Sequence, residues 1–471
     1  MNSTYVKGEE MPTKILIATW GEPSRYENVT YVYGEKRIQS CTSTGVLKEI
    51  LNPEHTVIIM LDSLASLFEL TNDFDNYNSL KDYLAIKLKQ TYITVPEFFK
   101  EFKEDRDAIF IAPNVGTFKA NNRDFKITLK GEMTDYFYVV YEKLAEFFIE
   151  WPTEYPFEIY FDMTHGINFM GNLTYRVLRE ISSILSLQGT VKFIVFNAEP
   201  YSPQLTEELY INVVEEEIIR PELFRKFPNS SKILPLKVNK KLLGDKEIKQ
   251  ISPQIQSCFH ELQKDYKEYL TFLASVAQGI PLGIFTFFPG EMEDLLDYIN
   301  KAINMYYKYI VLTFSGNEMV IKRQTYLTPY FRVLVQTYTL AHVLRRLNVS
   351  YQTEVSFPEI NTLAKKIYKY FPVILERISY ELDHIRKKEL RKLGINKKRW
   401  RVFSKKKWWM VFCKGKKQKE DVTRRNFFAH GGIARNTVEF KLNDQGDICV
   451  RYREVMKEKI KEHLFEVAIE K

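Results

Sequence analysis

The first 200 residues alternate short apolar runs with helical patterns, and this alternation limits the fold more than any other feature. The runs end at polar residues or glycine, which is typical of buried parallel strands. They cover residues 14–20, 55–61, 108–113, 157–162 and 191–196. Helical patterns lie between them at 44–51, 80–90, 134–151 and 168–187. This order predicts an α/β domain with a mostly parallel, Rossmann-like sheet.

Ligands in such sheets bind beyond the carboxyl ends of the strands. Three predicted strand ends carry suitable polar or small residues. These are Thr19, Trp20 and Gly21 after the first strand, Asn114 after the third, and Asp162, Thr164, His165, Gly166 and Asn168 after the fourth. The last group leads directly into a helix, whose free N–H groups can bind a phosphate. The alternative is an ordinary strand-to-helix turn in which His165 is a hydrogen-bonded structural histidine. The chain has no Gly-x-Gly-x-x-Gly or Walker pattern, which disfavours ordinary dinucleotide or ATP binding.

The segments around this sheet are less regular. A long polar loop is expected between Gly21 and the 40–45 segment, and residues 116–131 predict a hairpin that turns at Asn121 and Asn122. A strand at 208–214 can complete the first domain. Residues 220–256 contain four prolines, which indicate a linker with short helices. We therefore expect a first domain over residues 1–205 and a middle module over 206–256.

From residue 257 onward the apolar residues recur at helical spacing. Pro372 marks a break or a fresh start between two of the helices. The predicted helices cover 257–277, 291–310, 326–347, 359–371, 373–393 and about 453–470. The sequence thus predicts an all-α domain over residues 257–471.

Arg425, Asn426 and His430 stand close together near the end of this domain, before two glycines. Arginine can bind a phosphate and stabilise developing charge, and histidine transfers protons near neutral pH. Asn426 and His430 share a helix face, whereas Arg425 and His430 are about 140° apart around a helix. A site shared between two subunits would resolve that divergence. The pattern is a candidate site for RNA cleavage without metal, and a chance Arg–His spacing is the alternative.

Charge is distributed unevenly along the chain. The net charge is +8, but residues 386–425 carry 18 Lys and Arg against 3 acidic residues, whereas residues 1–200 carry 20 against 28. Three of the five tryptophans lie within the basic segment, and aromatics among cations favour single-stranded nucleic acid. The candidate RNA-binding residues are Lys405, Lys406, Lys407, Trp408 and Trp409. A solvated basic loop with inward-packed tryptophans and a lipid-facing basic patch are the alternatives.

The four cysteines are scattered and form no Cys-x-x-Cys pair. This spacing argues against a zinc site or a disulfide framework and suits a reducing cytosol. No uncharged apolar run is long enough to span a bilayer. We expect a cytoplasmic protein with no metal, no cofactor and no membrane partner.

Two motifs resemble those of a known family. The Asp162-Met-Thr-His-Gly stretch, with the Asn-Phe-Met that opens the next helix, resembles the Asp-x-Thr-His-Gly signature of CRISPR-associated Rossmann fold (CARF) domains. The Arg425–His430 stretch resembles the Arg-x4-6-His motif of HEPN ribonucleases. Together they make the chain resemble the CARF–HEPN ancillary ribonucleases of type III CRISPR systems, least of all over residues 205–256.

The resemblance implies a homodimer, with or without further assembly, that acts in antiviral defence. Its N-terminal pair would bind a cyclic oligoadenylate as allosteric activator, with cyclic tetra-adenylate as the expected ring. Its C-terminal pair would then cut single-stranded RNA and leave 2′,3′-cyclic phosphate and 5′-hydroxyl ends. One alternative is a ligand-controlled regulator that binds nucleic acid and cuts nothing. Another possibility is slow cleavage of the ring itself, positioned by residues near Trp20 and Asn114.

Overall fold

The computed structural model describes residues 11–68, 70, 74–93, 97–98, 102, 106–119, 124–150, 155–202, 208–222, 227, 233–389, 408, 422–434 and 436–469. The chain divides into two compact units, each built from separate stretches of sequence. The first unit contains Met1–Arg220, Pro235–Cys258 and Asn300–Val335, and the second contains Pro221–Leu234, Phe259–Ile299 and Gln336–Lys471. The domain limits expected after residues 205 and 256 refer to continuous segments and stay a prediction.

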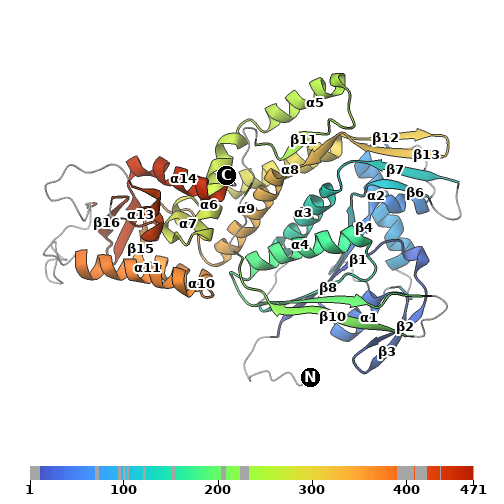
Figure 1. Ribbon diagram of the computed structural model, residues 1–471, viewed down its shortest axis with the longest axis horizontal. Coiled ribbons are helices and arrows are strands. Elements are labelled where there is room, and N and C mark those ends of the chain that lie inside the picture. Colours follow the sequence, from blue (N-terminus) through green and yellow to red (C-terminus); the bar gives the residue numbers. More distant parts are fainter. Residues whose placement is uncertain are drawn as a thin grey trace. The chain divides into compact units, whose positions relative to one another are not determined.

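An eight-stranded sheet is the centre of the first unit (Figure 1). Its strand order is β3-β2-β10-β9-β8-β1-β4-β5. The strands are β1 (Thr13–Thr19), β2 (Val29–Tyr33), β3 (Lys36–Ser40), β4 (His55–Leu61), β5 (Asp107–Ala112), β8 (Phe157–Asp162), β9 (Val191–Ala198) and β10 (Glu208–Ile218). The five predicted strands are all present, and β9, β8, β1, β4 and β5 run parallel. The Rossmann-like sheet is therefore confirmed.

The chain order reverses between β1 and β8, since β4 and β5 continue on one side and β9 on the other. The two strands pair in register, with Ala18 beside Asp162. A reversal of this kind opens a crevice at the carboxyl ends of the strands, where ligands bind in open α/β sheets. The two richest predicted ligand segments therefore meet at one edge of the sheet.

Helices cover both faces of this sheet. They are α1 (Ser43–Leu51), α2 (Tyr77–Leu88), α3 (Thr134–Glu150) and α4 (Asn168–Leu185), close to the predicted ranges. Val46 of α1 packs in a cluster with Ile194 of β9, whereas Tyr175 of α4 packs against Phe193. Neighbouring residues of a strand point to opposite faces, so α1 and α4 lie on opposite sides of the sheet.

The long polar loop expected after the first strand was partly wrong, because β2 and β3 form an antiparallel hairpin within it. Tyr31 and Val32 of β2 are buried, while most of β3 is exposed at the edge of the sheet. Exposed edge strands are commonly polar, which blocks unwanted pairing. Because these edge-strand residues are polar, the composition of the segment resembles that of a loop.

A second, four-stranded sheet has the order β12-β13-β7-β6. Its strands are β6 (Gly116–Lys119), β7 (Lys126–Lys130), β12 (Ile310–Ser315) and β13 (Glu318–Arg323). The predicted hairpin is confirmed, although Asn121 and Asn122 lie outside the described residues. Its strand β7 pairs in parallel with β13. A long stretch of intervening chain thus separates the two paired strands.

The second unit is helical with one small sheet. Its helices include α6 (Leu262–Ala277), α7 (Pro281–Thr286), α10 (Phe357–Ile367), α11 (Pro372–His384), α13 (Arg424–Ala429) and α14 (Glu454–Ala468). The division between the units falls within α8 (Met292–Lys308) and α9 (Pro329–Arg346). The sheet has the order β15-β17-β16, from β15 (Val355–Ser356), β17 (Ile448–Tyr452) and β16 (Val438–Leu442).

Two expectations for residues after 205 need correction. The region from residue 257 is helical as predicted but not all-α, because it contains β12 to β17. The stretch 220–256 is more than a linker with short helices, since it holds β11 (Leu236–Val238) and the fourteen-residue α5 (Asp245–Cys258). β11 pairs with β14 (Thr325–Leu327). Pro253 lies inside α5, where proline usually breaks a helix, and this misled the prediction.

A buried ion pair ties the two sheets of the first unit together. The Arg323 guanidinium bonds to the Asp62 carboxylate, and both side chains have no exposed surface. Arg323 also donates to the Asn114 carbonyl oxygen at 2.6 Å. Tyr77 donates to the same carboxylate at 2.7 Å. The cluster lies where β4 and β5 end, so residues of the distant β13 complete the sheet edge.

Arg323→Ala is expected to lower the free energy of unfolding by about 3–5 kcal/mol, because it leaves the Asp62 carboxylate buried without its cation. Arg37→Ala is the control, since Arg37 pairs with Glu208 at the surface. Its loss is expected to cost less than about 1 kcal/mol. Urea titration of both variants measures the difference. Equal urea midpoints for the two variants would show that the buried ion pair adds no more stability than the surface pair.

Candidate functional sites

Asp162 organises the carboxyl edge of the first sheet. Its side chain is 1% exposed at the end of β8. One carboxylate oxygen accepts hydrogen bonds from the hydroxyls of Ser43 and Thr44, each at 2.7 Å, and the other accepts from the Thr164 N–H at 3.1 Å. A buried carboxylate needs such donors. Asp162 therefore fixes the start of α1 against the end of β8, and three donors bind its carboxylate.

His165 lies beside this carboxylate and is bound through both its backbone and its ring. Its carbonyl oxygen accepts from the Gly21 N–H at 2.7 Å and from the Tyr26 hydroxyl at 3.1 Å. Its Nε2 accepts from the Ser43 N–H at 3.1 Å and lies 3.3 Å from the Tyr31 hydroxyl. Burial lowers the pKa of this imidazole. The neutral ring therefore carries its proton on Nδ1.

Gly166 leaves a space next to Thr19 that no other residue type could leave. A Cβ at this position would lie 2.3 Å from the Thr19 Oγ1. That hydroxyl is buried and has no hydrogen-bond partner among the described residues. The following helix α4 begins without a side-chain cap. The first N–H groups of α4 and the Thr19 hydroxyl next to Gly166 are thus candidate donors for a ligand.

The other predicted ligand residues divide into two groups. Trp20 has a fully buried indole that donates to the Thr44 hydroxyl at 3.0 Å, so its side chain supports the site from within. The Thr164 hydroxyl accepts from the Ala198 N–H, and Asn168 opens α4. Asn114 belongs instead to the Asp62 cluster, where its amide bonds to Ser63 and Val115.

Three residues of the His165 environment were missed by sequence reasoning. Tyr26, Tyr31 and Ser43 all come from the segment that was interpreted as a polar loop. Its serine- and threonine-rich end at 40–45 was the available signal. Tyrosines in a chain with 29 of them give no comparable signal.

The second candidate site is built on the short helix α13, which is fixed at both ends. Thr423 caps its start by accepting from the Asn426 N–H at 3.3 Å. At its end, Gly431 and Gly432 have φ angles of +56° and +79°. Such left-handed angles favour glycine and commonly end helices. His430 is therefore held immediately between the helix and this turn.

The three predicted catalytic residues differ in their surroundings. Arg425 and Asn426 are exposed, and the structure shows no hydrogen bond or ion pair of either side chain within the described residues. The His430 side chain is 46% exposed, and its Nδ1 lies 3.1 Å from Oε1 of Glu381 on α11. Sequence reasoning missed Glu381. The helix thus presents an arginine, an amide and a carboxylate-bound histidine, a set able to bind a phosphate and transfer protons.

Of the predicted RNA-binding residues, the structure describes only Trp408; Lys405, Lys406, Lys407 and Trp409 lie outside the described part of the chain. The Trp408 ring packs on the cations of Arg451 at 4.0 Å and Lys441 at 4.7 Å. Cation–π contacts of this kind are favourable. One tryptophan of the basic segment therefore packs on the strands β16 and β17.

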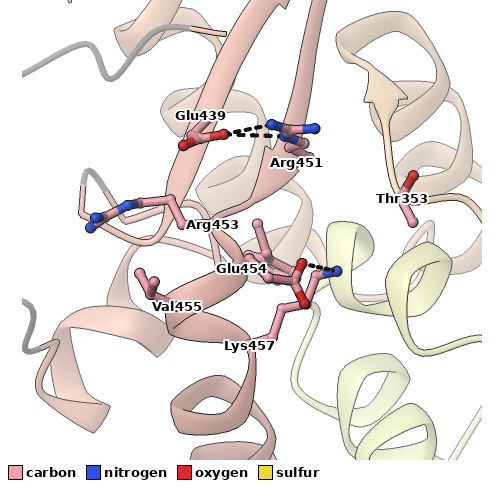
Figure 2. A pocket seen from close by; sticks show the side chains of 8 residues that line it. Thr353, Glu439, Arg451, Arg453, Glu454, Val455 and Lys457 are labelled. Carbon is pink, nitrogen blue, oxygen red and sulfur yellow. Dashed lines mark hydrogen bonds and ion pairs between the residues drawn. The ribbon is translucent and has the colours of Figure 1, made fainter.

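A cavity of about 390 Å³ lies at the end of these strands and the start of α14 (Figure 2). Arg451 is paired with Glu439 at 3.0 Å, and Lys457 is paired with Glu454 at 2.7 Å. Figure 2 shows both pairs as dashed lines. These two cations are therefore paired, and Arg453, the third cation of the lining, donates to the Asn436 carbonyl oxygen at 3.0 Å.

In the described stretches, no cluster of three or more His, Cys, Asp or Glu side chains is arranged to hold a metal ion. The same stretches contain no helix that is long and apolar enough to cross a membrane.

The family model described as the CARF domain of CRISPR system endoribonuclease Csx1 matches residues 15–200, and the model for the HEPN domain of the same endoribonuclease matches 371–454. The chain is 28% identical over 448 residues to the CRISPR system endoribonuclease Csx1 of Methanocaldococcus jannaschii, covering 91% of this chain and 87% of the relative. Both matched domains are those of a CRISPR system endoribonuclease. As predicted, the chain belongs to the CARF–HEPN family.

One solved structure shows a more distant similarity. Csm6 of Enterococcus italicus, bound to cyclic hexa-2′-fluoro-hexa-dAMP, is 11% identical, with 81% of this chain and 86% of that chain covered. The TM-score is 0.22.

Proposed function

We propose that this endoribonuclease cuts single-stranded RNA without a metal ion, and that a cyclic oligoadenylate bound at the first sheet activates it. The observation that carries the proposal is the short helix α13, which exposes Arg425 and Asn426 and is followed by a histidine paired with a carboxylate. This turn lies within the segment that the HEPN model matches. Cyclic tetra-adenylate is the proposed ring.

The proposed reaction is a transesterification within the RNA. The ribose 2′-oxygen attacks the neighbouring phosphorus, and the bond from phosphorus to the 5′-oxygen breaks. His430 accepts the 2′-hydroxyl proton or donates a proton to the leaving oxygen. Arg425 stabilises the charge that develops on the phosphate, and Asn426 orients the histidine or the RNA. The products are a 2′,3′-cyclic phosphate and a 5′-hydroxyl.

The proposed active form is a homodimer. Arg425 and His430 are five residues apart, which places them about 140° apart around a helix. Arg425 lies within α13 and His430 directly follows its last residue. A second copy can supply the arginine that one copy cannot bring to its own histidine.

The proposed ring site is the crevice between β1 and β8. Residues 1–200 are net acidic, so an anionic ring must be held by local donors rather than by the field of the domain. The Thr19 hydroxyl, the backbone around Gly166 and the start of α4 are such donors. Three donors already bind the Asp162 carboxylate, so its oxygens do not compete with the ring for the remaining donors.

Neither alternative function has a specific observation in its favour. Slow cleavage of the ring was assigned to residues near Trp20 and Asn114, but both side chains are buried and hydrogen-bonded. A regulator that only binds nucleic acid would have no use for the exposed Arg425 beside His430. We also propose that the basic segment at 386–425 contacts the RNA and that the protein acts in the cytoplasm.

The deciding experiment follows cleavage of a labelled single-stranded RNA in EDTA, with and without cyclic tetra-adenylate. Cleavage is expected only with the ring, and Arg425→Ala is expected to lower it by roughly 10²-fold, as for the loss of one charge-stabilising group. Lys459→Ala, a change at an exposed site on α14, is the matched control. If no ring size supports cleavage while duplex DNA binds tightly, the protein is a regulator and the proposal is wrong.

A further inference from the structure

Glu381 lies on α11, far from His430 in sequence, and its Oε1 is 3.1 Å from the His430 Nδ1. We propose that Glu381 is a positioning residue: it keeps the His430 proton on Nδ1 and so leaves Nε2 to exchange protons with the RNA. The inference rests on the proposed catalytic function of His430 and adds a residue to that site.

The burial of Glu381 distinguishes it from other carboxylates on the same helix. Its side chain is only 11% exposed, whereas Asp383 is exposed and pairs with Lys387 at the surface. A carboxylate removed from water requires a hydrogen-bond donor. Arg377, one turn earlier, uses one guanidinium nitrogen for the carbonyl oxygens of Gln278 and Gly279 at 2.6 and 3.1 Å, and its Nε has no hydrogen-bond partner among the described residues. The ion-pair partner that the structure gives the Glu381 carboxylate is His430.

The turn that carries His430 lies close to α11, the helix that carries Glu381. A Cβ on Gly431, the residue after His430, would lie 3.8 Å from the Ile378 side chain and 3.9 Å from the Arg377 side chain. Both of these residues belong to α11, and Ile378 is 1% exposed. The same helix that supplies the carboxylate therefore lies beside the turn that supplies the imidazole.

The chemistry of the pair follows from the imidazole itself. A neutral imidazole has one N–H group, and the ring nitrogen next to an acceptor retains it. With Nδ1 only 3.1 Å from the Glu381 Oε1, the ring is expected to keep its proton on that nitrogen, and Nε2 then has a free lone pair with no partner among the described residues. When Nε2 accepts the 2′-hydroxyl proton, the ring becomes a cation, which the carboxylate stabilises. The proton then passes from Nε2 to the leaving 5′-oxygen.

The simpler interpretation is an ordinary ion pair at the surface. Such a pair contributes roughly 0–1 kcal/mol to stability and has no particular effect on catalysis. The two interpretations therefore differ in what the removal of Glu381 does to the RNA-cutting rate, while both leave the fold intact.

The test compares ring-activated RNA cleavage by the full-length variants Glu381→Ala and Glu381→Gln with cleavage by the protein without a substitution. Alanine is expected to lower kcat by roughly 10²-fold, within the range for proton-transfer groups. Glutamine has the same shape, and its amide oxygen can accept a hydrogen bond from the Nδ1–H group. Because it carries no charge, a smaller loss of about 10-fold is expected. Glu376→Ala, at an exposed position on the same helix, is the matched control and should leave kcat unchanged.

Two further readouts separate positioning from a structural role. Solid-state ¹⁵N NMR of protein with labelled histidine, assigned with His430→Ala, should show the proton on Nδ1 in the native protein and a shift towards Nε2 in Glu381→Ala. In the His430→Ala background, adding Glu381→Ala should lower residual cleavage no further. A further loss there, or an unchanged tautomer, would overturn the inference.

The outcomes also separate this inference from the proposed function. If His430→Ala is inactive while both Glu381 variants keep full activity, the positioning role is wrong and the catalytic role of His430 stands. If His430→Ala itself remains active, the proposed catalytic site is wrong, and the inference fails with it.

Discussion

His430→Ala is expected to lower ring-activated RNA cleavage by roughly 10²- to 10⁴-fold, the range for removing a general acid or base. The side chain stands at the end of α13 between a capped helix and a left-handed turn. Alanine fits the same backbone, so the substitution should lower the rate of the chemical step without disturbing the fold. Initial rates with labelled RNA at saturating cyclic tetra-adenylate measure it, and ring affinity should be unchanged by calorimetry.

His260→Ala is the matched control for this prediction. His260 also places its Nδ1 near a carboxylate, 3.0 Å from Glu261, but both side chains are largely exposed. Its removal is expected to leave the rate unchanged, because an exposed pair has little influence on stability or geometry. Equal losses in both variants would mean that the effect is general and that His430 is not catalytic.

Gly166→Ala is expected to raise the concentration of cyclic tetra-adenylate needed for half-maximal activation by at least roughly 10²-fold, since displacements of about 1 Å can cost that much. The new Cβ would lie 2.3 Å from the Thr19 Oγ1 and 2.9 Å from its Cβ. Because Thr19 is fully buried at the end of β1, the turn after β8 must move instead. That turn carries the His165 carbonyl, which binds Gly21 and Tyr26.

Gly244→Ala controls for the effect of an added methyl group in the same unit. A Cβ there would meet only the Glu247 carboxylate, at 3.9 Å. Activation and affinity for the ring should match those of the unchanged protein, and thermal unfolding of both variants shows whether the fold is kept. A folded Gly166→Ala variant with normal activation would place the ring elsewhere.

The sequence was sufficient for the parallel sheet because its strands are buried on both faces. Residues such as Ile15, Leu16 and Ile17 have no exposed surface, so each strand appears in the sequence as a continuous run of apolar residues. The motif after β8 was visible for a related reason, since a strand that ends and a helix that begins within a few residues leave a short, distinctive segment. Asp162 and Gly166 could thus be named in advance.

Contacts between distant segments could not be read in the same way. Glu381 is one of many glutamates at helical spacing, and nothing near it indicates that His430 will be its neighbour. Arg323 ends a short strand next to a predicted helix, and its burial depends on Asp62, which comes from another part of the chain. Asn114 looked like a ligand residue because it follows a strand, yet its amide completes that buried cluster.

The pairing of β7 with β13 also has a consequence for the order in which the protein can fold during synthesis. Ile127 of β7 aligns with Met319, so a nascent chain must grow by almost two hundred residues before this ladder closes. Until then Asp62 lacks its cation and β7 lacks a neighbour on one side. Contacts so distant in sequence slow folding and leave strand edges open to aggregation. A truncated N-terminal fragment is consequently a poor substitute for the whole chain in ring-binding studies.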